Sequence, residues 1–181
     1  YNFKTKTSFK ACLGFKIVED MKETVVITSP LGNIRLVAED GFLLSCSFTE
    51  EPVTEKINNL FFLDIISQLN RYFDGDLKVF DIPVAIGGST FQKKVWMEVN
   101  KIPFGQTASY QEIANALSKP TASRAVGAAN GANPLLIVIP CHRIIASTGE
   151  LTGYAGGLWR KLKLLQMEAM DQPGQQYNLG F

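Results

Sequence analysis

One short segment, Ile139-Pro140-Cys141-His142-Arg143, places a thiol beside an imidazole and a guanidinium. Cysteine attacks as a thiolate, and a neighbouring base or positive charge lowers the pKa of its thiol. Consecutive residues of a strand point to opposite faces, so a contact between Cys141 and His142 requires a turn, which Pro140 favours. The segment indicates a nucleophile with its base. A small buried cysteine at a strand end remains the alternative, because free cysteines are often buried.

The rest of the sequence offers few groups for a metal site or a disulfide framework. The other cysteines, Cys12 and Cys46, form no CxxC pair, and His142 is the only histidine. We therefore expect no metal, no cofactor and no disulfide scaffold. No apolar run reaches the roughly 18 residues that span a bilayer, and the first residues lack the apolar core of a signal peptide. We expect an intracellular protein, cytoplasmic or nuclear, with no membrane partner.

Charge is distributed unevenly along the chain. Residues 1–88 carry 9 Lys/Arg and 12 Asp/Glu, a net of −3, whereas residues 89–181 carry 9 and 5, a net of +4. This weakly favours an anionic partner for the second half, although two solvated faces of differing charge explain it equally well. The groups Lys93-Lys94 and Arg160-Lys161-Leu162-Lys163 are too short for import signals, and we interpret them as solvated helix faces.

Before the nucleophile segment, the pattern predicts an α+β unit. Three β-like runs, Thr24–Thr28, Asn33–Ala38 and Phe42–Phe48, with the turn Asp40-Gly41, indicate an antiparallel meander. Apolar residues at helical spacing from Ile57 to Tyr72 predict a helix that ends at Gly75, and Asp76–Gly88 is typical of a linker. The predicted divisions are an unassigned extension (1–20), an N-terminal α/β domain (21–82), a linker (83–88), a second domain (89–170) and a tail (171–181).

The second half is predicted to be mainly helical. One helix starts at Ser89-Thr90, and Ser109 with Glu112 forms a capping box for another. Thr121 is expected to cap a third helix, making a helix-turn-helix candidate with the second. Leu135–Ile139 is consistent with a buried strand, and a last helix is expected over about 158–170. The predicted apolar stripes are Phe91, Val95, Trp96 and Val99; Tyr110, Ile113, Ala114 and Leu117; Ala122, Ala125, Val126 and Ala129; and Leu158, Leu162, Leu165 and Ala169.

The third of these helices is built almost entirely of small residues, with Arg124 as its single large protruding side chain. Small side chains let a helix approach a DNA groove closely, and its first amides can receive phosphate. The helix lacks the Gln, Asn and Arg array that reads bases in the major groove. This favours a protein that grips DNA without reading its sequence. An Ala-rich helix packed against a neighbour is the alternative, although Gly127 and Gly131 indicate close approach by something.

Taken together, these motifs resemble the alkylguanine-DNA alkyltransferase family. The family's Pro-Cys-His-Arg signature and the aliphatic residue after it stand at Pro140–Ile144, within a match over about 89–170. The other matching positions are Phe91-Gln92, Val95-Trp96, Ile102-Pro103, Gly105, Ser109-Tyr110-Gln111, Arg124–Gly127, Asn133-Pro134, Gly153-Tyr154 and Gly156-Gly157. The first half matches in architecture alone. The resemblance implies an α+β fold, with a ribonuclease-H-like antiparallel-sheet domain followed by an all-helical, winged-helix-like helix-turn-helix domain.

The resemblance also implies an activity. The protein would move a methyl or alkyl group from O6 of guanine, and from O4 of thymine, onto Cys141 in one irreversible turnover after the nucleotide is flipped out of the duplex. Its partner would be double-stranded DNA, bound as a monomer through the minor groove with little sequence preference. No second cysteine is near Cys141 in the sequence to regenerate the thiol.

The family's site residues carry over onto matching positions. Cys141 would be the acceptor thiolate, His142 its base through a water molecule, and Glu168 the partner of the imidazole's other side. Tyr110 would donate a proton near N3 of guanine, and Arg124 would enter the base stack. In the guanine pocket, Tyr154 would line the wall and the backbone amide of Ala155 would face O6. The main-chain carbonyls near Cys141 and Ile144 would accept from the exocyclic amine, and Asn133 would tie the recognition helix to the active-site turn. Further DNA contacts would come from Phe91, Tyr110, Thr121, Ala122 and Ser123.

The chain departs from the family pattern at Ala155, where serine is often found, which puts substrate range and inhibitor preference in doubt. The N-terminal metal site of some members lacks its ligands, so Cys12 and Cys46 are expected to be structural or incidental. Three alternatives remain: a binding-only relative, which would lack the acceptor cysteine; a cysteine hydrolase, which generally draws its histidine from a distant segment; and a helix-turn-helix regulator, which needs more base-reading side chains.

Overall fold

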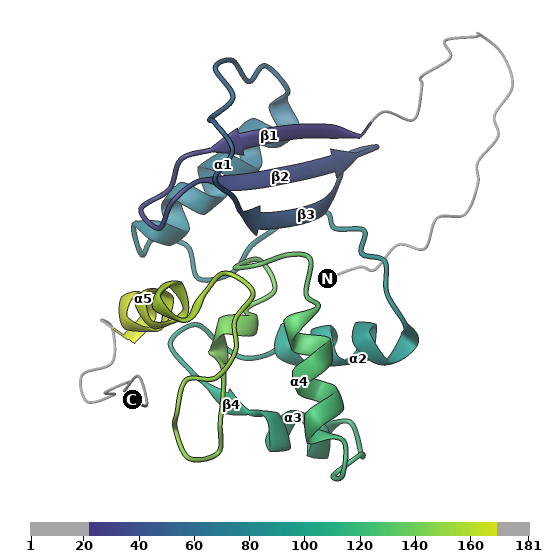
Figure 1. The fold of residues 1–181 in the computed structure, drawn as a ribbon. Helices are drawn as coiled ribbons and strands as arrows, with labels where there is room; N and C mark the ends of the chain where they lie inside the picture. Colours follow the sequence, from purple (N-terminus) through teal and green to yellow (C-terminus); the bar gives the residue numbers. More distant parts are fainter. Residues whose placement is uncertain (1–21, 170–181) are drawn as a thin grey trace, which may run out of the picture.

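The computed structural model describes residues 22–169, which form a sheet-bearing half and a helical half (Figure 1). The expectations for residues 1–20, including Cys12, and for the tail from 171 lie outside the described residues. The first half is a three-stranded antiparallel meander in the order β1-β2-β3, backed by helix α1. Its elements are β1 (Glu23–Ile27), β2 (Ile34–Glu39), β3 (Phe42–Phe48) and α1 (Leu60–Phe73). The predicted meander is confirmed.

Local sequence explains these elements. Asp40 and Gly41 take left-handed φ angles of 52° and 74°, which suit the tight turn between β2 and β3. Alternate residues of β2 are buried, as expected for a sheet with one face on the core. Helix α1 begins three residues after the predicted Ile57, because the side chain of Asn59 caps it by accepting from the Phe61 amide at 2.9 Å.

The segment predicted as a linker is packed along β3. The Leu43 amide donates to the Pro83 carbonyl at 2.8 Å, and the Ala85 amide donates to the Leu43 carbonyl at 3.1 Å. Phe80 and Ile82 in the same stretch are buried. Because its backbone is bonded and its apolar side chains lie in the core, this stretch is a fixed edge of the sheet rather than a free connection.

The second half is built from helices joined by a small sheet. The helices are α2 (Thr90–Val99), α3 (Tyr110–Ala116), α4 (Ser123–Gly131), the 3₁₀ turn η1 (Cys141–Arg143) and α5 (Leu158–Ala169). Capping boxes start α2 at Ser89 and α3 at Ser109, the latter as predicted. The strands β4 (Ala108–Ser109) and β5 (Ile144–Ile145) pair in parallel, so this half is not purely helical.

Three predicted helix details are wrong. Thr121 does not cap α4, which begins after Ala122 without any side-chain cap, and Ala125 is exposed. On α5 the predicted stripe is only partly correct, since Leu165 is buried and Leu162 and Ala169 are half-buried, but Leu158 is exposed. The buried face of α5 consists of Lys161, Leu164, Leu165 and Glu168. Two charged residues, Lys161 and Glu168, lie on this buried face, although the apolar spacing did not predict that they would be buried.

The predicted buried strand at Leu135–Ile139 is buried but turns instead of extending. Ile137 has a φ of 72°, and the only strand-like link in this stretch is a single bridge between Leu135 and Cys46 of β3. The Ile139 amide bonds back to the Leu135 carbonyl at 2.9 Å. An apolar run predicts burial, whereas its conformation depends on where the backbone finds partners. Burial raises the pKa of the Cys46 thiol to about 12, which leaves it inert beside this turn.

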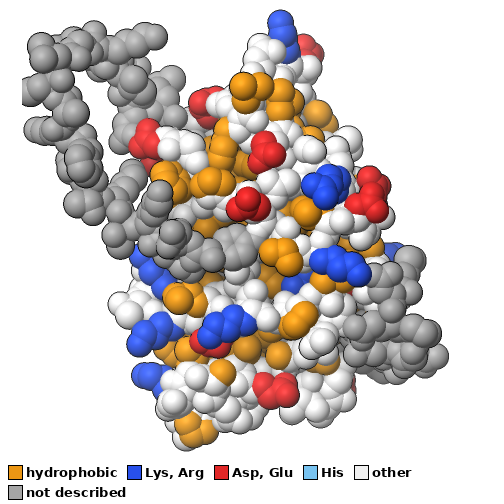
Figure 2. Space-filling view, turned by 180° about the vertical axis from the view of Figure 1, so that it is seen from behind, with side chains coloured by type: hydrophobic (Ala, Val, Ile, Leu, Met, Phe, Trp, Pro, Cys, Tyr) orange, Lys and Arg blue, Asp and Glu red, His pale blue; other side chains and the backbone are white. Residues whose placement is uncertain are grey.

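The two halves of the molecule differ in surface charge on the face shown in Figure 2. Figure 2 shows acidic side chains gathered over the upper, sheet-bearing half of the face in view, and Lys and Arg mostly over the lower, helical half. Within residues 22–169, no helix has the length and apolarity to cross a membrane, and no group of three His, Cys, Asp or Glu side chains could hold a metal ion.

Two glycines provide a matched stability test. Gly88 has a φ of 129°, and a Cβ there would lie 2.9 Å from the Trp96 ring, whereas Gly131 has open space around it. Gly88→Ala should lower the free energy of unfolding by about 1–3 kcal/mol, and Gly131→Ala should raise it by about 0.5–1 kcal/mol. Urea denaturation measures both. Equal effects of the two substitutions would contradict the described backbone.

Candidate functional site

Cys141 opens the 3₁₀ turn η1, at the place where the sequence requires the chain to turn. Its side chain is buried, and two asparagines bind backbone carbonyls at Cys141 and just before it. The Asn130 amide donates to the Cys141 carbonyl at 3.2 Å, and the Asn133 amide donates to the Ile139 carbonyl at 2.9 Å. Because Asn130 belongs to α4 and Asn133 follows directly after it, the end of this helix is tied to the turn that carries the thiol.

The resting thiol is protonated. Burial raises the pKa of Cys141 to about 11, and the Asn133 amide and the charge of Lys161 oppose this rise only in part. A thiolate therefore forms at neutral pH only when a nearby base takes the proton.

The imidazole of the next residue, His142, is hydrogen-bonded to Glu168. It is fully buried, and its Nε2 lies 2.9 Å from Oε1 of Glu168. An ionised carboxylate only accepts hydrogen bonds, so Nε2 carries the proton and the lone pair of Nδ1 is free. No partner for Nδ1 exists within residues 22–169. Burial lowers the pKa of His142, and Glu168 opposes this shift, so the imidazole is neutral and able to accept a proton.

Glu168 receives five hydrogen bonds. On Oε1 it accepts from Tyr72 at 2.6 Å, from His142 at 2.9 Å and from Nη2 of Arg143 at 3.0 Å. On Oε2 it accepts from Nε of Arg143 at 2.9 Å and from the Gly105 amide at 3.1 Å. Burial alone would raise the pKa of Glu168, but His142 and Arg143 hold that pKa well below its ordinary value. The carboxylate is thus a permanent negative charge.

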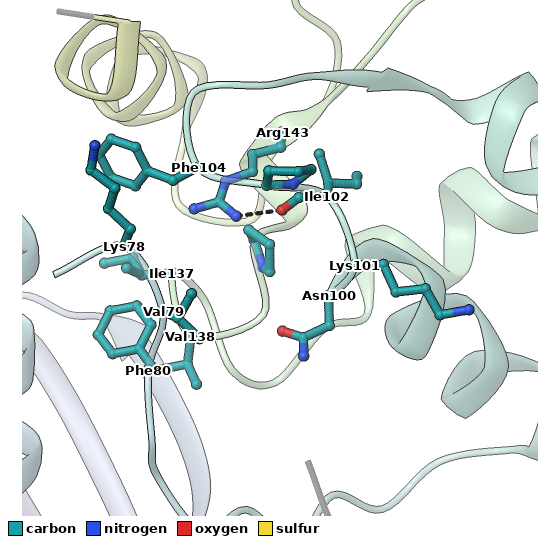
Figure 3. Close-up of a pocket in the computed structure, with 12 residues that line it drawn as sticks. Lys78, Val79, Phe80, Asn100, Lys101, Ile102, Phe104, Ile137, Val138 and Arg143 are labelled. Atoms are coloured by element: carbon teal, nitrogen blue, oxygen red, sulfur yellow. Dashed lines mark hydrogen bonds between the residues drawn. The ribbon is translucent and has the colours of Figure 1, made fainter. Parts of the chain in front are cut away.

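Arg143, which donates to this carboxylate, also lines the pocket drawn in Figure 3. Its Nη1 donates to the Ile102 carbonyl at 2.7 Å, and its guanidinium lies 5.8 Å from the centre of the Phe104 ring. A cavity of about 240 Å³ lies beside it, lined also by Asn100 and Ile137. Neither Cys141 nor Tyr110 lines this cavity, so it is separate from the face where α4 is exposed.

The structure contradicts the interpretation of Lys161 as part of a solvated helix face. It is fully buried, and its Nζ donates to the Ile144 carbonyl at 2.5 Å and the Thr152 carbonyl at 2.6 Å. Burial lowers the pKa of Lys161 to about 8, and the nearby Cys141 works in the opposite direction. The ammonium ties the strand after the nucleophile to the loop at Leu151–Gly157 and places positive charge near the thiol.

That loop carries two of the residues predicted to form a guanine pocket, Tyr154 and Ala155. The Tyr154 ring stands edge-on to His142, with ring centres 6.4 Å apart, and its hydroxyl is buried with no partner in the described part of the chain. Ala155 is exposed. A Cβ on Gly156 would lie 2.6 Å from the Tyr154 ring and 2.8 Å from the Phe48 ring, so only glycine fits there.

Three of the predicted DNA contacts, Tyr110, Ser123 and Arg124, line one open cavity of about 360 Å³. The Tyr110 hydroxyl accepts from Oγ1 of Thr152 at 3.2 Å. The close approach expected at Gly127 and Gly131 is not found among the described residues, since a Cβ on Gly127 would lie at an ordinary contact distance of 3.6 Å from the Tyr110 ring and one on Gly131 would meet nothing. Beside the start of α4, Thr121 is exposed and Ala122 is half-buried. Phe91 does not line this cavity. Nζ of Lys119 lies over the Phe91 ring, 5.8 Å from its centre.

Sequence reasoning missed the roles of Tyr72, Asn130 and Lys161. A tyrosine at a core position of a helix needs a polar partner, which was a usable signal at Tyr72. On the last helix, Lys161 and Glu168 are seven residues apart and share a face with Leu164 and Leu165, so a shift of the helical phase would have marked both as buried. Nothing local in the sequence marks Asn130.

The carboxylate network yields a pH-dependent stability prediction. Glu168→Gln should lower the unfolding free energy by about 3–5 kcal/mol at neutral pH, because Arg143 is left without its counter-charge. The folded-state pKa of Glu168 is lowered from 4.5, so its stabilisation is present above that pH and is lost as the pH falls toward the folded value.

The difference between Glu168→Gln and wild type should therefore shrink below about pH 4.5. Urea denaturation over a pH series measures it. Glu150→Gln, at an exposed site, is the control and should match wild type within about 0.5 kcal/mol throughout. A Glu168→Gln deficit that stays constant with pH would count against an ionised Glu168.

Two family models match the chain. The ribonuclease-like domain of 6-O-methylguanine DNA methyltransferase matches residues 22–86, and the DNA-binding domain of that protein matches residues 90–170. Among solved structures, the O6-methylguanine methyltransferase of Mycobacterium tuberculosis is similar at a TM-score of 0.76 and 39% identity, covering 86% of this chain and 97% of that one. A structure of the M. tuberculosis protein in complex with DNA matches at a TM-score of 0.75 and 41% identity, covering 83% and 94%.

Two relatives named methylated-DNA–protein-cysteine methyltransferase are similar over almost their whole length. The protein of Mycolicibacterium paratuberculosis is 44% identical over 160 residues, which are 84% of this chain and 96% of that protein. The protein of Methanosarcina acetivorans is 44% identical over 149 residues, which are 79% of this chain and 96% of that protein. The residues matched by the DNA-binding model contain the thiol, the imidazole and the carboxylate described above, and the chain belongs to the methylated-DNA–protein-cysteine methyltransferase family.

Proposed function

We propose that this protein repairs DNA by moving a methyl or alkyl group from O6 of guanine, or O4 of thymine, onto its own Cys141. The observation that carries the proposal is the buried series of Cys141, His142 and Glu168, in a chain that both domains of the family match. Displacing guanine from a saturated carbon needs a strong soft nucleophile, which a thiolate provides.

In the proposed reaction, Nδ1 of His142 takes the Cys141 proton through a water molecule. Glu168 stabilises the imidazolium that results, and the ammonium of Lys161 offsets the charge of the thiolate. The sulfur then attacks the alkyl carbon, so a C–S bond forms as the C–O6 bond breaks. The departing guanine takes a proton at N3 from the Tyr110 hydroxyl, and the proton first taken by His142 returns through solvent to the Tyr110 oxygen, which leaves both side chains neutral. The thioether is stable, and each molecule reacts once.

DNA binding in the proposal uses the exposed side of α4. Its first amides have no side-chain cap and are available to phosphate oxygens, and Arg124 is exposed beside them. Arg124 fills the space that the flipped nucleotide leaves in the base stack. The small residues of α4 allow a monomer to approach the minor groove with little sequence preference. The substrate places this activity in a compartment that holds DNA, either the cytoplasm or the nucleus.

The first test is stoichiometric. Incubation with duplex DNA containing one O6-methylguanine should add a single methyl group, found by intact mass and peptide mapping on Cys141. Cys46→Ala is the matched control and should react like wild type, because its thiol is buried and unreactive. Repeated turnover would indicate a hydrolase instead, and tight binding without a mass change would indicate a binding-only protein.

The second test separates nucleotide flipping from chemistry. Arg124→Ala should slow repair of duplex DNA by roughly tenfold or more, while reaction with free O6-benzylguanine stays within about twofold, because the free base needs no extrusion. Lys93→Ala removes another exposed cation of the helical half and should affect both reactions little. Single-turnover rates of the three proteins give the comparison, and an equal loss on both substrates would remove Arg124 from the flipping step.

A further inference from the structure

We infer that Tyr72, from the sheet-bearing half, is a positioning residue that sets the basicity of His142 through Glu168. The inference rests on the proposed function, because it assumes that His142 is the base for Cys141. It assigns the first half of the chain a part in the chemistry beyond supporting the fold.

The geometry leaves the Tyr72 hydroxyl little choice of partner. Tyr72 is fully buried near the end of α1, and its hydroxyl donates to Oε1 of Glu168 at 2.6 Å and lies 3.4 Å from Nε2 of His142. Its ring is held by Phe80 and Phe104, with ring centres 5.2 and 6.0 Å away. Burial and the adjacent Glu168 raise the pKa of Tyr72, so the hydroxyl stays protonated and remains a donor.

The Tyr72 bond is the shortest of the five that Glu168 accepts. Each donor draws negative charge from the carboxylate and weakens its attraction for an imidazolium. The cations that face His142 are Arg143 of η1 and Lys161 of α5, and both disfavour a positive imidazole. Tyr72 acts in the same direction from α1. It keeps His142 neutral at rest, with Nδ1 open to the proton of the thiol.

Removal of the hydroxyl should therefore raise the pKa of His142. In Tyr72→Phe the ring and its packing remain, and Glu168 becomes a stronger partner for the imidazolium. Because His142 is the only histidine of the chain, its NMR titration needs no assignment. The midpoint should move up by about half a pH unit or more. The acid limb of Cys141 alkylation by iodoacetamide, followed by peptide mass, should move with it, since a protonated His142 cannot accept the thiol proton.

Phe80→Leu is the matched control. It weakens the packing of the Tyr72 ring and keeps the hydroxyl, so it should lower stability without moving either midpoint. Unchanged midpoints in Tyr72→Phe, or an equal shift in Phe80→Leu, would overturn the inference.

Two further measurements keep the outcomes separate. In the wild-type protein, the Tyr72 hydroxyl proton should exchange slowly and show a nuclear Overhauser effect to the Nε2 proton of His142; its absence also overturns the inference, even if Tyr72→Phe does not fold. Methyl transfer from duplex DNA containing O6-methylguanine to the wild-type protein tests the proposed function. Failure there removes the proposed function, whereas iodoacetamide and NMR report on Tyr72 independently of any alkylguanine.

Discussion

The carboxylate of Glu168 is a full negative charge inside the protein, and the site depends on how that charge is satisfied. An isolated ionised carboxylate in a protein interior costs several kcal/mol, and it is tolerated only when donors surround it. Here the donors come from α1, from the loop at Gly105, and from η1. Four separate parts of the chain, α5 included, must therefore assemble correctly before the imidazole of His142 is oriented.

The thiol is positioned by backbone more than by side-chain packing. The turn after Pro140, the carbonyls taken by Asn130 and Asn133, and the parallel pairing of β4 with β5 fix Cys141 relative to α3 and α4. The same arrangement explains why the apolar run before Pro140 does not extend as a strand. The backbone N–H and C=O groups of this run form hydrogen bonds that hold the turn, so its side chains are buried although the run forms no regular strand.

Much of this could be predicted from short-range patterns. Strand alternation required a turn between Cys141 and His142, the Ser109 capping box marked α3, and the Asp40-Gly41 turn marked the meander. The failures share a physical cause, since they depend on partners distant in sequence. Tyr72 and Glu168 are 96 residues apart, and no local pattern pairs them. Lys161 was interpreted from its charge as a surface residue, but two backbone carbonyls allow it to be buried.

The sheet also restricts which residue can occupy position 156, next to Tyr154. The Phe48 ring at the end of β3 lies against the loop that carries Tyr154, close enough to exclude any side chain between them. The position of the Tyr154 ring, which stands edge-on to His142, is therefore bounded partly by a residue that makes no hydrogen bond to Glu168. A substitution at position 48 can then alter the surroundings of the imidazole while all five hydrogen bonds of the carboxylate stay in place.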